Sequence, residues 1–459
     1  MSKLSFFKDF NILPKKHNSI FFALCIFIFT FCCFGGAEPD LNFNLALMFI
    51  SGVFLIFALA FSNFNGIFDR SPIYLKYLFA APIVLPLIQL IPIPADILMH
   101  FPGQQLRFEV LNLVNGDLAW HPLSLAPKET AYTAAMSIFF VGFLIACTTV
   151  ERRQFNFLVI AVIIIAVLGT LIGALQSSDA YPFLRFYEYA HKNAVIGFYA
   201  NKNHMALTLS VSLLLSKTIF DQLKWKFSRF LFLAFTAFIF VSVIATNSRA
   251  GIALVIAAII FTNYNYLKNI PIKILLLSSM FLAVVFYYIL SSAAFNVVYA
   301  RFYDVGADGR WGFLVNSSTM LRDFLIFGSG YGSFSTVYMT REGIDAVSAF
   351  YTNQLHNDFL QIIIEGGLLA LVTLALLVFS IFKAWRASSR SPSSRAAAQT
   401  GISIIILFAA HSVVDYPLRR PAAIVYFCIG LAYLIRELLS TEELSPKQRT
   451  SIAKRLTLG

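Results

Sequence analysis

Long apolar runs most constrain what this chain of 459 residues can fold into. A helix that crosses a lipid bilayer needs about 20 mostly apolar residues, and the sequence approaches this length repeatedly. The runs lie at about 19–36, 45–62, 73–93, 131–149, 154–175, 202–219, 229–246, 250–267, 273–292, 358–384, 398–415 and 421–438. We therefore expect an all-α integral membrane protein with about 12 transmembrane helices.

Charged residues are few and lie mainly between the apolar runs. They make up 13% of the chain, whereas a soluble domain carries roughly a quarter. The net charge of +12 could suggest a nucleic acid partner, but the Lys and Arg residues form no single patch, so we expect none. Most of them fall on one side of the membrane if both termini are cytoplasmic, as the positive-inside rule requires. The five Cys lie inside apolar runs, so neither a disulfide framework nor a metal site is expected.

Two segments on the predicted outer side are long enough to carry function. The first spans 94–130, and the second, 293–357, lies between the ninth and tenth runs. In the second segment, apolar residues recur at helical spacing, which predicts an amphipathic helix at the membrane surface. These residues are Phe313, Leu314, Met320, Leu321, Phe324 and Leu325. On the inner side, the segment 385–397 is rich in Ser and Arg and is predicted to be a linker.

Polar residues gather at the predicted outer ends of the runs. An ionisable group buried in a bilayer is costly, which makes it a functional candidate. Asn201, Asn203 and His204 open the sixth run, where helix capping by Asn is the simpler alternative. Arg249 follows Asn247 and Ser248 in a tight hairpin between the seventh and eighth runs. Its planar guanidinium suits a pyrophosphate, although an interfacial Arg can also contact lipid phosphates.

The long outer segment holds a third polar cluster. Arg310 lies in Asp308-Gly309-Arg310-Trp311, and a glycine-rich stretch follows at 327–334. Glycines permit close backbone approach and left-handed turns. As a phosphate-binding signal the stretch is weak because it does not follow a strand. Arg310 itself could be an ordinary surface residue of a loop.

A fourth polar cluster begins the tenth run. Asp358, Gln361 and Glu365 are spaced i, i+3 and i+7, so they share one helix face. Such a face should line a cavity instead of contacting lipid. His356 lies at the outer mouth of this face and is the candidate general base. The alternative is a His that only caps a helix or bonds to the backbone.

A weaker candidate lies at the end of the eleventh run. His411 and Asp415 are spaced i and i+4, and Arg419-Arg420 follows them. Side chains at this spacing meet on one helix face. We interpret them as a structural pair that stabilises the outer end of the helix bundle.

In their order along the chain, these motifs resemble the O-antigen ligase/polymerase superfamily over roughly residues 190–384. The motifs are Tyr199-Ala200-Asn201-Lys202-Asn203-His204-Met205-Ala206, Asn247-Ser248-Arg249, Arg310 followed by Gly328-Ser329-Gly330-Tyr331-Gly332-Ser333-Phe334, and His356-Asn357-Asp358-Phe359-Leu360 through Glu365-Gly366-Gly367. Each motif is modest alone, but four in order are specific. The stretch Trp120-His121-Pro122-Leu123-Ser124-Leu125 is similar to one in exopolysaccharide polymerase-like members.

The resemblance implies a GT-C-like fold with a long periplasmic loop between spans 9 and 10. It implies that Arg249 and Arg310 bind the pyrophosphate of a lipid-linked donor and that His356 is catalytic. Asp358 is a second catalytic candidate, which would orient His356 or stabilise its charged form. The other pocket candidates are Asn201, Asn203, His204, Gln361 and Glu365.

The runs and the resemblance together suggest a division of the chain into regions. These are a cytoplasmic N-terminus at 1–18, an N-terminal transmembrane region at 19–190 with its periplasmic loop at 94–130, a ligase/polymerase core at 191–384 that includes the periplasmic loop 293–357, a C-terminal transmembrane pair at 385–438, and a cytoplasmic tail at 439–459.

The activity implied by the resemblance is an inverting, metal-independent glycosyl transfer without a cofactor. A glycan would move from undecaprenyl pyrophosphate to an acceptor sugar hydroxyl at the periplasmic face of the bacterial inner membrane. A polysaccharide polymerase for O-antigen or exopolysaccharide is favoured, and an O-antigen ligase that uses lipid A-core is the alternative. The expected partners are the lipid-linked donor, the acceptor, membrane lipids and a chain-length regulator.

A lipid-linked oligosaccharide transporter is a further alternative, since about 12 spans with both ends inside is a common transporter layout. Transporters usually place polar groups near the midplane at the interface of two repeats. Here the sequence shows no twofold repeat, and the polar groups cluster on one side. The pattern therefore favours an enzyme.

Overall fold

The computed structural model describes residues 18–37, 43–61, 71–114, 116, 119–177, 181–187, 190–191, 194–223, 225–267, 309–343, 352–388 and 391–442. Within them the fold is helical apart from one small hairpin. The elements are α2 (Asn18–Phe34), α3 (Phe43–Ala60), α5 (Ile73–Gln89), β1 (Pro92–Pro94), α6 (Ala95–Leu98), α7 (Gln105–Leu113), β2 (Trp120–Pro122), α8 (Pro127–Thr149), α9 (Arg152–Gln176), η1 (Pro182–Leu184), α10 (Lys202–Gln222), α11 (Ser228–Ala245), α12 (Arg249–Leu267), α15 (Gly309–Phe324), α16 (Phe334–Tyr338), α17 (Asp358–Ala387), α18 (Pro392–Ser412), η5 (Pro417–Arg419) and α19 (Pro421–Glu442).

In the described part of the chain, six helices are long and apolar enough to cross a membrane. They are α8, α9, α11, α17, α18 and α19. Shorter apolar helices lie within α2, α3, α5 and α12. The predicted run 273–292 lies outside the described residues, and each of the other predicted runs coincides with a helix. The expectation of an all-helical membrane protein is thus confirmed.

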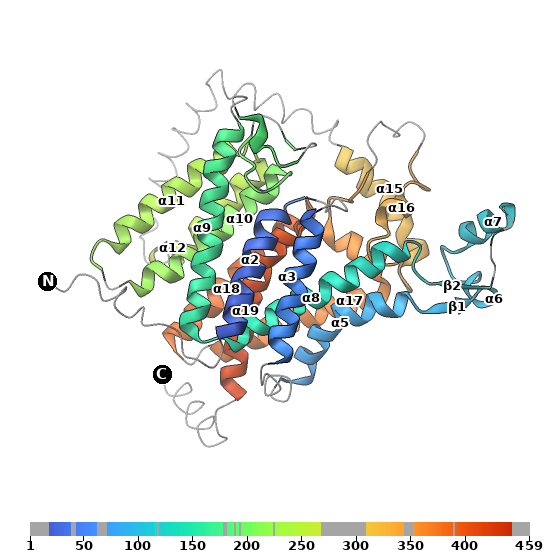
Figure 1. Ribbon diagram of the computed structural model, residues 1–459, viewed down its shortest axis with the longest axis horizontal. Coiled ribbons are helices and arrows are strands. Elements are labelled where there is room, and N and C mark those ends of the chain that lie inside the picture. The colour runs from blue at the N-terminus through green and yellow to red at the C-terminus, as the bar shows by residue number, and fades with distance from the viewer. Residues whose placement is uncertain are drawn as a thin grey trace.

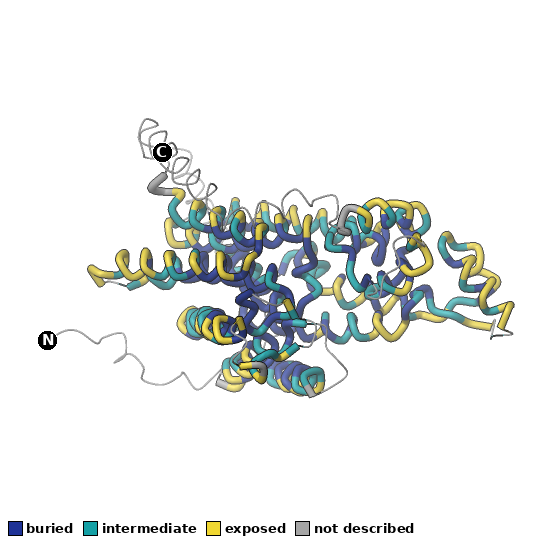
Figure 2. Tube along the Cα trace, turned by 90° about the horizontal axis from the view of Figure 1, so that it is seen from above, coloured by how far each residue is buried: buried dark blue, intermediate teal, exposed yellow. Residues whose placement is uncertain are grey.

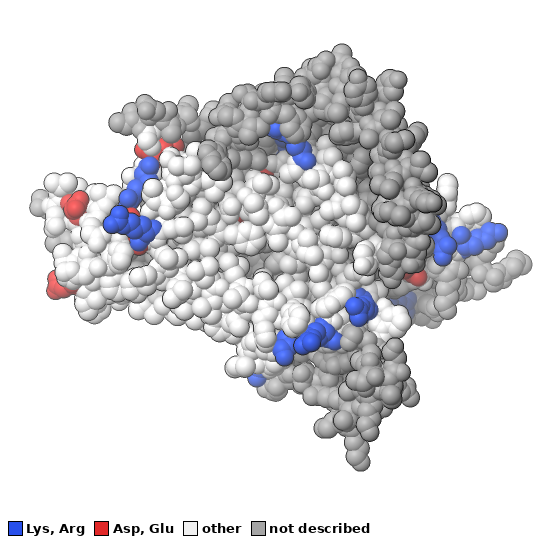
Figure 3. Space-filling model, turned by 180° about the vertical axis from the view of Figure 1, so that it is seen from behind, with Lys and Arg blue, Asp and Glu red and all other residues white. Residues whose placement is uncertain are grey.

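The surface of the bundle is apolar where lipid would surround it. Phe29, Ile50 and Phe57 each expose more than half of their surface. Exposed residues line the outer faces of the helices while buried residues fill the centre (Figure 2). From behind, a broad uncharged area separates the Lys and Arg residues, which lie near its margins (Figure 3). Exposed apolar surface of this extent marks contact with a membrane or partner instead of water.

The helix α10 is buried among its neighbours and packs against α9, α11, α12 and α18 (Figure 1). Its residues from Asn203 to Ser216 are all buried. The hydroxyls of Ser210 and Ser212 donate to the carbonyl oxygens of Ala206 and Thr208, so these polar groups are satisfied inside the helix. A helix with several hydroxyls can therefore occupy the core.

One end of the bundle joins several helix termini through backbone hydrogen bonds. The amide of Ala200 donates to the carbonyl of Gly36 at 3.2 Å, and that of Ala422 donates to Gly35 at 3.0 Å. These bonds hold the end of α2 beside the starts of α10 and α19. At the opposite end, the guanidinium of Arg436 donates to the carbonyl oxygens of Cys147 and Val150 and so caps α8.

The inner linker predicted at 385–397 is much shorter in the structure. The helix α17 continues to Ala387, and α18 begins at Pro392. The side chain of Ser391 accepts a hydrogen bond from the amide of Ser394, and Pro392 occupies the first helical turn. A Ser cap followed by Pro favours a helix start, which explains the early beginning of α18.

The predicted amphipathic helix in the long outer segment is α15. Its buried Met320 and Phe324 pack with Phe334, Tyr338 and Ile364 in a small core of their own. In Figure 1, α15 and α16 lie together near the start of α17. The helix therefore covers the start of α17 with its apolar face.

Candidate active site

His356 stands at the start of α17 in an unusual backbone conformation. Its φ is 59°, in the left-handed region that non-glycine residues rarely adopt. The next residue, Asn357, caps α17 by accepting a hydrogen bond from the amide of Leu360 at 3.0 Å. The cap and the turn together direct the imidazole of His356 inward, where 22% of the side chain stays exposed. Strained positions of this kind concentrate at functional sites.

Asp415 is the carboxylate around which the predicted residues gather. Its Oδ1 lies 3.3 Å from Nδ1 of His356 and 3.5 Å from Nε2 of His204. Its Oδ2 accepts a hydrogen bond from Nδ2 of Asn203 at 2.7 Å and a longer one from Asn201 at 3.4 Å. Residues from α10, the start of α17 and the segment after α18 thus meet at one fully buried carboxylate.

Asn201 does more than cap α10. Its side chain accepts from the amide of Asn203, so the predicted cap is present. The same side chain also donates to Asp415. Capping and site formation are therefore combined in one residue.

The predicted hairpin between α11 and α12 adjoins this cluster. The hydroxyl of Ser248 donates to Oδ1 of Asn203 at 2.7 Å, which links the hairpin to Asp415. Asn247 has a φ of 54°. Among the described residues, Asn247 and His356 are the two non-glycine residues with a positive φ. Arg249 begins α12 directly after this turn, and its side chain is exposed.

The helix α15 contacts the site through Phe313. Its ring stacks on the imidazole of His356, with centroids 6.2 Å apart and planes inclined by 16°. Arg310 lies one turn earlier on α15, but its side chain is outside the described part of the structure. Residues at i and i+3 share a helix face. The backbone of Arg310 therefore occupies the part of α15 that borders His356.

A second polar network surrounds Arg419, four residues beyond Asp415. Its Nη1 donates to Oε2 of Glu365 at 2.6 Å, and its Nε lies 3.7 Å from Oδ1 of Asp358. Asp358 also accepts from Ser412 and from the amide of Leu418. This network holds the segment between α18 and α19 against the start of α17.

Gln361 extends the second network. Its Nε2 donates to Oε1 of Glu365 at 3.0 Å, and its Oε1 accepts from the amide of Leu355 at 3.0 Å. Asp358, Gln361 and Glu365 do share a buried face of α17, as their spacing predicted. That face is occupied by protein partners, chiefly Arg419.

The carboxylate that contacts His356 differs from the expected one. Asp358 was expected to orient His356, but its oxygens face Ser412, Leu418 and Arg419. Asp415 takes the position beside Nδ1 of His356. Sequence reasoning treated Asp415 mainly as a partner of His411, whose Nε2 is the more distant at 3.9 Å.

The glycine-rich stretch serves backbone packing. α17 is broken at Gly367, where φ is 63°. The amides of Ser329 and Gly330 donate to the carbonyls of Ile364 and Glu365 beside this break. A Cβ on Gly328 would lie 2.2 Å from the oxygen of Glu365, so only glycine permits this approach.

The stretch Trp120–Leu125 meets the same loop. The amide of Leu125 donates to the carbonyl of Ser329 at 2.9 Å, and a Cβ on Gly330 would lie 2.2 Å from Oγ of Ser124. The two outer segments singled out in the sequence are therefore packed against each other. The glycine-rich loop in turn bonds to α17 beside the break at Gly367.

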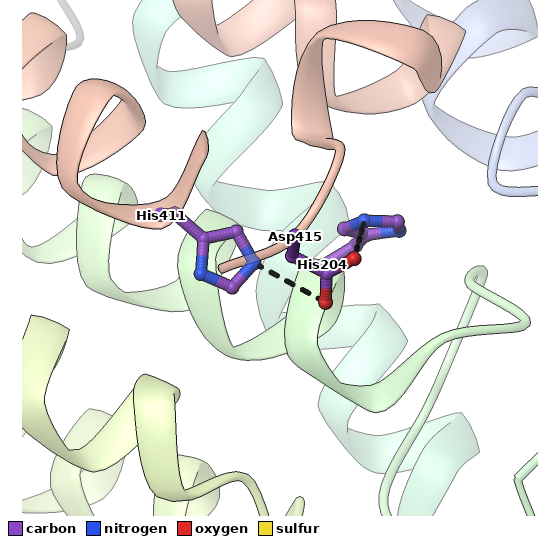
Figure 4. A group of neighbouring side chains, drawn as sticks. All are labelled: His204, His411 and Asp415. Carbon is purple, nitrogen blue, oxygen red and sulfur yellow. Dashed lines mark ion pairs between the residues drawn. The ribbon is translucent and has the colours of Figure 1, made fainter. Parts of the chain in front are cut away.

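His204, His411 and Asp415 form a group that could hold a metal ion. One ligand atom from each lies within 4.8 Å of the others, and all three residues are buried (Figure 4). Two imidazoles and a carboxylate are ligands that Zn²⁺ accepts. The same carboxylate already accepts hydrogen bonds from Asn203 and from the amide of Tyr416. His–Asp contacts without a metal therefore also account for the arrangement.

The charge states of Asp415 and Arg419, between α18 and α19, follow from the groups around them. Burial alone would raise the pKa of Asp415, but the imidazoles of His204, His356 and His411 hold it well below its ordinary value. Burial would lower the pKa of Arg419, but the carboxylates of Glu365 and Asp358 raise it. Both groups are thus charged at neutral pH.

Comparison with known protein families identifies the central part of the chain. A family model described as O-antigen ligase matches residues 232–375. This segment is similar to the O-antigen ligase family. The predicted relation to the O-antigen ligase/polymerase superfamily is confirmed. A search among curated proteins found no significant match.

The O-antigen ligase match runs from α11 into α17. It includes Arg249, Arg310 and His356, and it ends before Asp415. The structure therefore adds residues from outside the matched segment to the site, from α10 on one side and from the segment after α18 on the other. A membrane enzyme of the O-antigen ligase/polymerase type is the class that this match supports.

Proposed function

We propose that the protein is an inverting glycosyltransferase that moves a glycan from undecaprenyl pyrophosphate to a sugar hydroxyl. The contact of 3.3 Å between His356 and Asp415 carries this proposal. A carboxylate beside Nδ1 favours the tautomer with a proton on Nδ1, which leaves Nε2 free to accept the proton of the acceptor hydroxyl. Asp415 then stabilises the imidazolium that forms.

The leaving group of this reaction is a pyrophosphate, which needs its developing negative charge stabilised more than it needs a proton. Arg249 and Arg310 would provide that charge stabilisation through bidentate hydrogen bonds. The connection from Ser248 through Asn203 to Asp415 supports a position of Arg249 beside His356. The stacking of Phe313 on His356 supports a position of Arg310 beside His356 as well.

We propose a metal-independent reaction because two guanidinium groups suffice for the charge of a pyrophosphate. Treatment with a chelator should leave the rate of transfer unchanged. A loss that Zn²⁺ restores, and that a His411→Ala variant does not show, would instead assign a role to the metal-capable group.

The membrane arrangement that accompanies this proposal is a GT-C-like bundle of about 12 spans in the bacterial inner membrane. The site would face the periplasm and both termini the cytoplasm, because the basic residues between the predicted runs lie mostly toward the other end. A position of the site at one end of the bundle is supported by the hydrogen bonds that gather the starts of α10 and α19 beside the end of α2.

Within this class we favour a polysaccharide polymerase for O-antigen or exopolysaccharide over a ligase that uses lipid A-core. The packing of Trp120–Leu125 against the loop beside α17 supports this preference, because that stretch resembles polymerase-like members. A chain-length regulator would be a partner of such an enzyme.

The deciding experiment supplies the purified protein with a lipid-linked repeat unit and no lipid A-core. A ladder of glycan lengths would establish a polymerase. Transfer that begins only when lipid A-core is added would establish a ligase. No transfer under either condition, from a protein that is folded, would refute the glycosyltransferase.

A further inference from the structure

A cavity of about 550 Å³ lies at the end of the bundle away from the candidate active site. Its wall includes the starts of α9 and α18 and the ends of α10 and α19. Gln222 lines it, and His204 lies about five turns earlier on α10, or about 27 Å along the helix axis. On α18, its innermost wall residue is Ser403, which is still about two turns from His411. The cavity is therefore separate from the group around Asp415.

Polar and apolar side chains share the wall of this cavity. On the polar part, Asn156 from α9 donates a hydrogen bond to the side chain of Gln222 from α10 at 2.7 Å. The apolar part includes Phe155, Phe261 and Leu439. Cavities of this size bind small molecules or part of a larger one. A wall with amides beside aromatic rings suits a ligand that has both a polar and an apolar part.

The cavity carries more positive than negative charge. Its charged wall residues are Arg152, Lys217, Arg436, Asp221 and Glu437. Asp221 forms an ion pair with Lys217 on the same helix, so neither charge is left over. Glu437 lies near Arg436 and also accepts a hydrogen bond from the hydroxyl of Ser394. The remaining excess charge is positive, which favours an anionic ligand over a cationic one.

Two guanidinium groups face each other in this wall. Arg436 is held in place because its Nη1 donates to the carbonyl oxygens of Cys147 and Val150, both at 2.8 Å. Its guanidinium also lies 5.0 Å from the centroid of the Phe155 ring. Arg152 is near enough for its charge to act on that of Arg436. Within the described part of the chain, the side chain of Arg152 forms no hydrogen bond or ion pair. An anion between the two groups would relieve their repulsion.

We propose that this cavity binds an anionic phosphate ester, the headgroup of a membrane lipid, with its phosphate between Arg152 and Arg436. The planar fork of Arg suits phosphate oxygens. Asn156 is placed to bind headgroup hydroxyls, and Phe155 and Phe261 provide an apolar surface for the start of an acyl chain. In the proposed orientation this end of the bundle lies at the cytoplasmic leaflet, where anionic headgroups attract basic residues. The site takes no part in the proposed glycosyl transfer, and the bound lipid joins the ends of α9, α10, α18 and α19.

Native mass spectrometry of the delipidated full-length protein tests the proposal by measuring dissociation constants. The probes are phosphatidylglycerol, phosphatidylcholine, which has a phosphodiester but no net charge, and glycerol 3-phosphate as a soluble ester. Phosphatidylglycerol should bind more tightly than phosphatidylcholine. Arg152→Gln should weaken its binding by about five-fold, the usual effect of one basic residue on an anionic headgroup. Arg153→Gln is the matched control, because Arg153 is also exposed on the first turn of α9 but does not line the cavity.

A second pair of variants changes the shape of the cavity and leaves its charges in place. Thr400→Trp on α18 fills the cavity and should also weaken binding by about five-fold or more. Ile406→Trp on the same helix should bind as wild type, since Ile406 is 46% exposed and does not line the cavity. Thermal unfolding without lipid checks that each variant is folded.

Three results would each overturn the proposal. They are equal binding of phosphatidylglycerol and phosphatidylcholine, equal binding by the Arg152→Gln and Arg153→Gln variants, and wild-type binding by Thr400→Trp. Binding of glycerol 3-phosphate that depends on Arg152, without binding of the lipid, would support the phosphate site and assign it to a soluble ester.

Discussion

His356 and Asp415 lie on separate segments of the chain, and Nδ1 of the first is 3.3 Å from Oδ1 of the second. The carboxylate also accepts a hydrogen bond from Asn203, so Asp415 lies between the imidazole of His356 and the buried helix α10. An imidazole with a carboxylate beside one of its nitrogens is the arrangement that a general base needs. Catalysis should therefore depend on both residues.

Replacement of Asp415 by Asn should lower the rate of glycan transfer by about 10²–10⁴-fold, the usual contribution of a general base. The amide can no longer stabilise the imidazolium or enforce the Nδ1–H tautomer. The rate is measured with saturating lipid-linked donor, and His356→Ala should lose a similar factor. Asp221→Asn, an exposed site at the opposite end, is the control. Full activity in Asp415→Asn would remove this residue from the mechanism.

Arg249 should act mainly on the departing pyrophosphate. Arg249→Ala is expected to lower kcat by about 10²–10³-fold, as loss of a charge-stabilising group does elsewhere. Arg249→Lys should recover only part of the rate, because an ammonium lacks the bidentate fork. Arg229→Ala, also at an exposed helix start, should behave as wild type. Equal activity of the Arg249 and Arg229 variants would contradict the assignment.

The buried ion pair between Arg419 and Glu365 should stabilise the fold as well as hold the segment after α18 against α17. Arg419→Met leaves the buried carboxylates of Glu365 and Asp358 without their cation, which should destabilise the fold by about 3–5 kcal/mol. Thermal unfolding in detergent measures this effect. Lys217→Met breaks an exposed i, i+4 pair with Asp221 and should cost at most about 1 kcal/mol. A stability loss no larger than in this control would argue against the buried pair.

Gly330 should not tolerate a side chain. Its φ is 107°, and a Cβ would lie 2.2 Å from Oγ of Ser124. We expect Gly330→Ala to destabilise the protein by about 1–3 kcal/mol through backbone strain. Gly312→Ala on α15 meets nothing within 4 Å and should be neutral or slightly stabilising. Comparable unfolding temperatures for the two variants would disprove the close approach.

The depressed pKa of Asp415 predicts a pH dependence of stability. Its ionised form stabilises the fold at pH values above the unfolded-state pKa of Asp, and this contribution is lost as the pH falls through the folded-state pKa. Asp415→Asn should thus unfold at a lower temperature than wild type near neutral pH. The difference should narrow below about pH 4. A gap that stays constant across this range would mean that the charge of Asp415 is not the stabilising factor.

Helix positions and the polar motifs were predictable because both depend on local spacing. The apolar runs coincide with helices wherever the structure describes them, and Asp358, Gln361 and Glu365 do form one buried face. The cap at Asn201 follows from the preference of Asn for that position. These features need only neighbours in the sequence.

The central role of Asp415 was not predictable in the same way. Its i, i+4 relation to His411 suggested a local pair, yet the contacts with His356 and Asn203 are shorter. Those partners come from other helices, and their approach depends on how α10, α17 and α18 pack. The packing role of the glycine-rich stretch was not predictable either. Its backbone bonds to α17 beside the break at Gly367, and helical periodicity does not reveal that break.

The break at Gly367 divides α17 into a short and a long helical segment. Backbone bonds connect the loop at 326–330 to residues on both sides of the break, from Ile364 to Leu368. The short first half, which carries Asp358 and Glu365, and the beginning of the long second half are thereby bonded to the same loop. Any shift of this loop would therefore be felt at the start of α17, two residues from His356, because the loop replaces the helical hydrogen bonds that the break removes.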